Sequence, residues 1–385
     1  MSRRSSPDDP SSRRSDSVES NAADPPRPGP TRRRYLAVTA GVGLSGAIAG
    51  CASLGSEDSR PKSESPLSTD EGVDESEPVE RESKPAETEE TEESKSDDAE
   101  SDAKAVDDLP LFDAHTHVIP TAARGHDPLS ADELVAWMDD RGVDRAVVLP
   151  FDSPEGYPVQ APSWWVLEEV AAHPDRLIPF CSIDPRTLVY GDEIVEEVLE
   201  GYLERGARGF GELKVGMAID DERLEGVYEL CAEYELPILF HTDRQSLTDD
   251  VGLPGLEGVL ASYPEVDFVA HAHGWWAHMA ADVESRDLGG IPEGSIDSRG
   301  RVWELLAEYD NIYGDLSTRA GWNALTRDPE VGQEFLETHH DRLVFGTDYL
   351  YPGQEVPHFD LFERFDLELE AWADLRYRTL EGLLR

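Results

Sequence analysis

The chain has 385 residues, which allows one large domain with additional segments. It carries 82 Asp and Glu against 34 Lys and Arg, a formal net charge of −48, and residues 109–385 alone hold 56 acids and 20 bases. This balance excludes nucleic acid as a partner, because phosphate binding needs clustered Lys and Arg.

Residues 1–51 are expected to form a disordered polar extension followed by an export signal. Residues 31–36 (TRRRYL) resemble a twin-arginine signal, and the apolar stretch after them is too short and too rich in glycine to span a membrane comfortably. Residues 48–51 (IAGC) then resemble a lipobox, which makes Cys51 the predicted lipidation site. The sequence therefore predicts export by the twin-arginine route and a lipid anchor on the outer face of the cytoplasmic membrane. The alternative is a plain N-terminal membrane anchor.

Residues 52–108 are expected to be a disordered acidic linker. From residue 56 to residue 108 there are 21 acids, 6 bases and no aromatic side chain. Such a segment cannot bury enough apolar surface to fold, so we expect an extended tether between the membrane and the domain that follows.

From residue 109 to residue 385, segments typical of strands alternate with segments typical of helices. The amphipathic runs Ala131–Arg141, Glu193–Arg205, Glu222–Tyr234 and Leu367–Leu384 are among the expected helices. Eight such units predict an α/β fold, the (β/α)8 TIM barrel. An open doubly wound sheet is the alternative, but no glycine-rich phosphate loop follows the first strand. The expected strands are 111–117, 145–151, 177–183, 208–214, 236–242, 267–272, 311–316 and 343–348.

Residue types that bind metals end five of these strands. His115 and His117 end the first strand, and side chains alternate along a strand, so both imidazoles point the same way. The carboxyl ends of all strands meet at one mouth of a barrel, where the chemistry of this fold is found. The sequence therefore predicts a metal site at that mouth. The other strand-end residues are Glu212 and Lys214 (fourth strand), His241 (fifth), His271 (sixth) and Asp348 (eighth).

Five runs resemble the amidohydrolase superfamily, specifically its amidohydrolase-2 branch of metal-dependent TIM-barrel hydrolases. They are FDAHTHVIP, RGFGELKVG, LPILFHTD, DFVAHAHG and LVFGTDYLYPG, and the resemblance covers residues 110–385. It implies that His115, His117, His241 and His271 bind a divalent metal. It also implies that Asp348 binds the metal and accepts a proton from the attacking water. The acidic surface and the near absence of lysine further suggest a haloarchaeal type of lipoprotein.

Zn²⁺ is the first candidate for this metal, with Mn²⁺ or Fe²⁺ as alternatives, and one or two ions are expected. Glu212 is a further candidate ligand. Lys214 is the single lysine of residues 109–385. It either bridges two ions as a carbamate, binds a substrate carboxylate, or pairs with Glu212 in a buried ion pair without a role at the metal.

Three further residues are candidates for contact with substrate. His273 follows His271 with one residue between them; either is a possible ligand, and we favour His271, which leaves His273 for substrate. Trp275 belongs to a long irregular stretch, 274–299, that forms either a lid over the pocket or a packed excursion. Arg319 follows the seventh strand and binds either an anionic substrate group or a surface carboxylate.

The function predicted from the sequence is a metal-dependent hydrolase that activates water to cleave an amide, ester or lactone-like bond in a small molecule. A metal-dependent non-oxidative decarboxylase is the enzymatic alternative, since the same branch contains such enzymes. A non-catalytic surface lipoprotein that binds a ligand is the third possibility. The sequence predicts neither the substrate nor the oligomeric state.

Overall fold

The computed structural model describes residues 106–384. The export signal, Cys51 and the linker up to residue 105 lie outside the described residues and stay predictions. Within the described part of the chain, no helix has the length and apolar character needed to cross a membrane. Cys181 and Cys231 are both free and buried.

Eight parallel strands form two sheets, one of β1, β2 and β3 and one of β4 to β8, each in chain order. Every expected strand is present, although each is shorter than the apolar run that predicted it. The α/β character with parallel pairing is therefore confirmed. The strands are β1 (Phe112–Thr116), β2 (Arg145–Val148), β3 (Leu177–Pro179), β4 (Phe210–Leu213), β5 (Ile238–His241), β6 (Phe268–His271), β7 (Ile312–Asp315) and β8 (Leu343–Val344).

Backbone hydrogen bonds link the two sheets at both of their edges. Between β3 and β4, the Cys181 nitrogen donates to the Gly209 oxygen over 3.0 Å, and the Gly211 nitrogen donates to the Cys181 oxygen over 2.7 Å. Between β1 and the chain after β8, the Asp348 nitrogen donates to the His115 oxygen over 2.8 Å. These contacts bring the end of β1 beside Asp348, 233 positions later in the chain.

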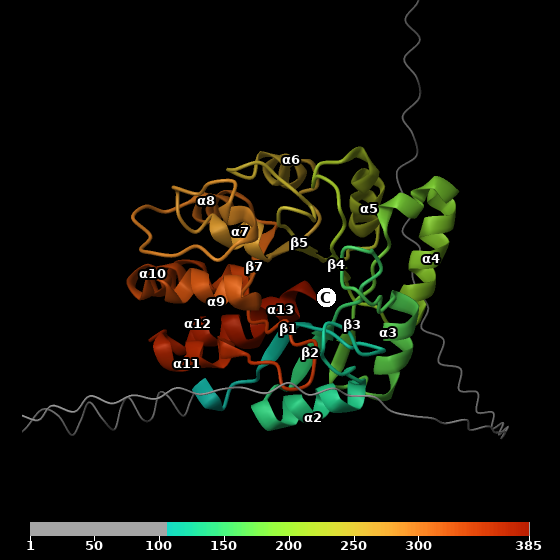
Figure 1. Ribbon diagram of the computed structural model, residues 1–385, viewed down its shortest axis with the longest axis horizontal. Helices are drawn as coiled ribbons and strands as arrows, with labels where there is room; N and C mark the ends of the chain where they lie inside the picture. The colour runs from blue at the N-terminus through green and yellow to red at the C-terminus, as the bar shows by residue number, and fades with distance from the viewer. Residues whose placement is uncertain (1–105, 385) are drawn as a thin grey trace, which may run out of the picture. The chain divides into compact units, whose positions relative to one another are not determined.

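Helices surround the strands on the outside, while α13 lies near the centre of the view (Figure 1). Apolar side chains from six of the strands pack in one cluster with Leu380 and Leu383 of α13. The helices are α2 (Ala131–Arg141), α3 (Ser163–Glu169), α4 (Asp192–Glu204), α5 (Glu222–Glu233), α6 (Pro254–Ser262), α7 (His273–Ala277), α8 (Arg301–Glu308), α9 (Thr318–Thr326), α10 (Pro329–His339), α11 (Leu361–Arg364), α12 (Leu369–Ala373) and α13 (Thr379–Leu383).

Local signals explain why the expected helix over residues 131–141 has those bounds. Ser130 caps its first turn by accepting from the Glu133 nitrogen, while the Glu133 carboxylate accepts from the Ser130 nitrogen in a capping box. Gly142 ends the helix with a φ of 69°, a conformation that glycine adopts without strain. The expected helix over 367–384 is instead divided into α12, a π-helical turn over Asp374–Arg378, and α13.

Asp152, which follows β2, holds the start of α3 and gives a pH-dependent prediction. Its carboxylate accepts from the Ser163 nitrogen over 3.1 Å and from the Ser163 hydroxyl over 2.5 Å. Burial raises the pKa of Asp152 from 3.8 to about 6, so the folded state holds a proton that the unfolded chain releases. This contribution to stability is complete below pH 4 and is lost as the pH rises through 6.

We expect wild type to lose about 3 kcal/mol of unfolding free energy between pH 4 and pH 7 relative to the variant Asp152→Asn, which does not titrate. Urea denaturation of both proteins at four pH values measures the difference. A difference that stays constant over this range would contradict the prediction.

Candidate metal centre

His115 and His117, at the end of β1, present two ring nitrogens to each other. Their Nε2 atoms lie 3.1 Å apart, and both side chains are fully buried. The Nδ1 atom of His117 lies 2.9 Å from the Leu149 oxygen, an acceptor that requires Nδ1 to carry the proton. The Nε2 lone pair of His117 therefore faces the space that the Nε2 atom of His115 also faces.

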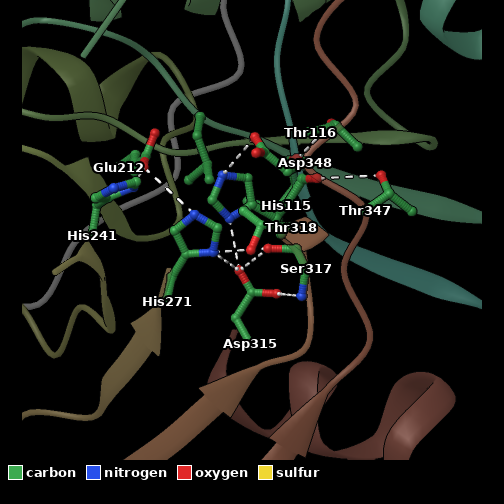
Figure 2. Close-up of polar contacts among 12 residues, drawn as sticks. His115, Thr116, Glu212, His241, His271, Asp315, Ser317, Thr318, Thr347 and Asp348 are labelled. Atoms are coloured by element: carbon green, nitrogen blue, oxygen red, sulfur yellow. Dashed lines mark hydrogen bonds and ion pairs between the residues drawn. The ribbon is translucent and has the colours of Figure 1, made fainter. Parts of the chain in front are cut away.

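Asp315, at the end of β7, contacts two imidazoles through one carboxylate oxygen. Its Oδ2 atom lies 2.7 Å from Nδ1 of His115 and 3.1 Å from Nδ1 of His271 (Figure 2). The Nε2 atom of His271 is buried and has no hydrogen-bond partner. The imidazoles of β1 and β6 therefore both turn their Nε2 atoms away from Asp315 and toward the centre of the cluster.

Glu212 of β4 brings a buried carboxylate to the same cluster. Its oxygens lie 3.8 Å from Nε2 of His117 and 3.8 Å from Nε2 of His271. His241 of β5 lies beside Glu212, with Nδ1 2.7 Å from Oε1, and its Nε2 lies 3.1 Å from Asp243. Both ring nitrogens of His241 thus face carboxylates, and the structure places His241 as a neighbour of Glu212 outside the candidate ligand groups.

Asp348 completes the cluster from the loop after β8. Its Oδ1 atom lies 3.3 Å from Nε2 of His117 and 3.6 Å from Nε2 of His115. Its side chain is 25% exposed, the largest exposure among the residues that face the centre, so Asp348 lies on the side open to solvent. The residue has a φ of 56°, and Gln354 donates to its backbone oxygen, which holds the carboxylate in this position.

Among the described residues, two groups have ligand atoms close enough to hold one ion. The first is His115, His117 and Asp348, and the second is His115, Glu212 and His271; within each group the atoms lie within 4.8 Å of one another. The groups share His115, whose free ring nitrogen has one lone pair and binds one ion. This geometry favours a single ion.

The electrostatics of the cluster favour a cation. Burial lowers the pKa of His115, but the carboxylates of Asp315, Asp348 and Glu212 more than offset this and raise it to about 9. Burial also lowers the pKa of His271, with His115 adding to the effect, to about 4. The carboxylates of Glu212 and Asp348 thus face this space, and that of Asp315 lies behind the imidazoles of His115 and His271. Such a set is costly to bury unless a cation compensates it, and the imidazole and carboxylate donors suit Zn²⁺, Mn²⁺ or Fe²⁺.

Lys214 and His273 lie beside this cluster without entering either group. The Lys214 amine is 3.7 Å from Oε1 of Glu212 and 5.8 Å from the centre of the Phe151 ring. Burial raises the pKa of Glu212, but Lys214 and His241 outweigh it and hold that pKa well below its usual range. His271, and not His273, supplies the nitrogen of a candidate group, and His273 is half-buried.

The structure does not support the other two expected substrate contacts. Trp275 is completely buried in the main apolar core, so the stretch from 274 to 299 begins as a packed helix, α7, rather than as a lid lined by this indole. Arg319 is exposed on the first turn of α9, outside both candidate groups.

Asp315 and Ser317 are the residues of this cluster that the sequence analysis missed. The Ser317 hydroxyl lies 2.7 Å from Oδ2 of Asp315 and 2.8 Å from Nδ1 of His271. A usable signal was present, because Asp315 ends the seventh strand just as His241 and His271 end theirs.

Asp113 stands two residues before His115, so strand alternation alone would point its side chain the same way. Its carboxylate accepts from the Thr347 hydroxyl over 2.6 Å. The register of β1 against β2 shifts between Asp113 and Thr116, so simple alternation does not extend to Asp113.

A family model described as amidohydrolase matches residues 112–384. No curated protein matches the chain. An uncharacterised TIM-barrel protein from Bordetella bronchiseptica has a similar structure at 17% identity and a TM-score of 0.52, over 72% of this chain and 98% of that one. This likeness concerns the fold alone.

Two structures with TM-scores below 0.5 are also similar, each over 72% of this chain and 99% of the other. One is a probable 2-pyrone-4,6-dicarboxylic acid hydrolase from Acinetobacter baumannii, at 13% identity and a TM-score of 0.47. The other is a 5-carboxyvanillate decarboxylase from Sphingomonas paucimobilis, at 14% identity and a TM-score of 0.43.

Proposed function

Because this chain belongs to the amidohydrolase family, we propose that residues 109–385 form a (β/α)8 barrel enzyme that uses one divalent metal ion to hydrolyse an amide, ester or lactone-like bond in a small molecule. The observation that carries the proposal is the pair of buried Nε2 atoms of His115 and His117, 3.1 Å apart. With both Nδ1 atoms facing other acceptors, the two Nε2 atoms face each other and are the ring nitrogens available to a cation. A bound cation accounts for that arrangement.

We assign the ligands from the two candidate groups, which are His115 with His117 and Asp348, and His115 with Glu212 and His271. A divalent ion held there would act as a Lewis acid on a carbonyl oxygen and lower the pKa of water toward about 7. Asp348 is the residue placed to accept a proton, since its carboxylate borders the cluster and is partly open to solvent. Lys214, 3.7 Å from Glu212, and the half-buried His273 are the side chains that we assign to an anionic or polar part of the substrate.

A non-oxidative decarboxylase is the second candidate, because the two groups cannot hold two ions through the same His115 nitrogen and a single ion would suit decarboxylation as well as hydrolysis. Hydrolysis stays the first candidate because Asp348 lies within 3.6 Å of both β1 imidazoles and is ready to take a proton from water.

The test combines metal analysis with a reaction panel on the purified full chain in molar salt. We expect about one metal ion per chain and hydrolysis of at least one substrate among aryl esters, lactones and N-acyl amines. Release of carbon dioxide from aromatic carboxylic acids, without hydrolysis, would replace the hydrolase with the decarboxylase. A full metal complement without either reaction would favour the ligand-binding lipoprotein. A folded chain that takes up no metal would overturn the proposal.

A further inference from the structure

One oxygen of the Asp315 carboxylate contacts the Nδ1 atoms of two imidazoles, those of His115 and His271. We propose that Asp315 is a positioning residue, which sets the tautomers of His115 and His271 so that both present a bare Nε2 lone pair to the same ion. This inference rests on the proposed function, because it concerns the metal that the cluster is proposed to hold. It assigns to β7 a role that neither the sequence motifs nor the family match provides.

The contacts of Asp315 leave little freedom to the two rings. Its Oδ2 atom lies 2.7 Å from Nδ1 of His115, 3.1 Å from Nδ1 of His271 and 2.7 Å from the Ser317 hydroxyl. Its Oδ1 atom accepts from the Ser317 nitrogen over 2.8 Å. Figure 2 shows these contacts converging on one carboxylate below the two imidazoles. The side chains of Asp315 and His115 are 0% exposed, so water does not compete for either group.

A carboxylate without a proton accepts hydrogen bonds and donates none. The contacts of Asp315 fit an acceptor on both oxygens, because the Ser317 nitrogen donates to Oδ1 and the Ser317 hydroxyl donates to Oδ2, beside which both Nδ1 atoms lie. Each Nδ1 atom must then carry a proton, directed to Oδ2 or, for His271, to the Ser317 oxygen 2.8 Å away. A neutral imidazole with a proton on Nδ1 has its lone pair on Nε2. His115 and His271 belong to one candidate group, and the Nε2 atom of His271 has no hydrogen-bond partner.

The backbone around Asp315 fits this carboxylate closely. The Trp276 indole nitrogen donates to the Asp315 backbone oxygen over 2.9 Å, which ties the end of β7 to α7. A Cβ atom at Gly346 would lie 2.3 Å from Oδ1 of Asp315. The carboxylate can therefore occupy this position only because residue 346 is a glycine. His117 is oriented differently, by the Leu149 backbone oxygen, and should not respond to a change at Asp315.

The variant Asp315→Asn separates positioning from simple packing. An asparagine of the same shape presents one acceptor oxygen and one NH₂ group, so it cannot accept from both Nδ1 atoms through a single charged oxygen. One imidazole then loses its fixed tautomer or rotates. Asp249→Asn is the matched control, because Asp249 also accepts from backbone nitrogens, those of Gly255 and Leu256, but lies in the segment before α6 and contacts no histidine.

The experiment measures Zn²⁺ affinity by competition with a chromophoric chelator, and the visible spectrum after Co²⁺ substitution, on the full chain. We expect Asp315→Asn to weaken Zn²⁺ binding by about 10- to 100-fold and to shift the Co²⁺ spectrum. Asp249→Asn should leave both unchanged. Equal Zn²⁺ affinity and identical Co²⁺ spectra in Asp315→Asn and wild type would overturn the inference while leaving the proposed function intact. A wild-type chain that binds no Zn²⁺ would instead overturn the proposed function.

A second measurement uses wild type alone, and it tests the inference even if the Asp315→Asn chain fails to fold. Nitrogen-15 spectra of histidine-labelled wild type, with Zn²⁺ bound, report which ring nitrogen of each imidazole carries the proton. We expect a proton on Nδ1 of both His115 and His271. A proton on Nε2 of either residue would overturn the inference without the use of any variant.

Discussion

The double variant His115→Ala/His117→Ala is expected to lose its metal and, with it, activity by a factor on the order of 10³ or more. The two Nε2 atoms are the closest pair of candidate ligand atoms, 3.1 Å apart and fully buried. The alanine methyl groups cannot bind a metal, so Glu212 and Asp348 are left without the cation that the imidazoles would hold between them. Metal content per chain after dialysis, together with turnover of whichever panel substrate wild type cleaves, measures the effect.

The matched control for this prediction is His126→Ala/His173→Ala. It also removes two histidine side chains, but ones outside the candidate groups: His126 stacks on Tyr351, and His173 contacts Asp132. We expect this control to bind the wild-type amount of metal. If the His115/His117 variant kept a full complement of metal, or if the control lost metal equally, the assignment of the β1 imidazoles would be wrong.

The variant Asp348→Asn is expected to keep metal but to lose turnover by about 10²- to 10⁴-fold, with the loss in kcat rather than in KM. Asparagine preserves the shape of the side chain and removes its capacity to accept a proton. It also tolerates the φ of 56° at this position better than most residues, so the loop after β8 should keep its course. His115, His117, Glu212 and His271 remain in place as metal ligands.

Steady-state kinetics and metal content, compared with those of Asp249→Asn, test this prediction. A variant that keeps wild-type kcat would exclude Asp348 as the proton acceptor. A variant that loses metal as completely as the His115/His117 variant would show that Asp348 is chiefly a ligand. The kinetic loss should also appear against hydrolysed substrates more strongly than in any decarboxylation, because only hydrolysis needs a proton removed from water.

The order and type of the elements could be predicted from local pattern. Apolar runs separated by amphipathic segments indicated all eight strands, because the inner and outer faces of a parallel sheet are both buried and such strands are continuously apolar. The amphipathic pattern predicted the bounds of α2, and the structure shows that capping residues at both ends fix them. The pattern left open whether Trp275 belongs to a lid or to a packed excursion, because local sequence does not distinguish an irregular loop from a short helix whose indoles fill the core.

His115, His117, Glu212, His271 and Asp348 could likewise be predicted as a cluster, since each stands at or just after a strand end and the carboxyl ends of parallel strands share one side. The partner of each ring nitrogen could not be predicted, because hydrogen bonds depend on distances of a few tenths of an ångström between separate strands. Only in the folded chain does the Asp315 carboxylate lie between His115 and His271, 200 and 44 positions away in sequence. The same packing turns both nitrogens of His241 toward Glu212 and Asp243, a contact that strand alternation alone does not determine.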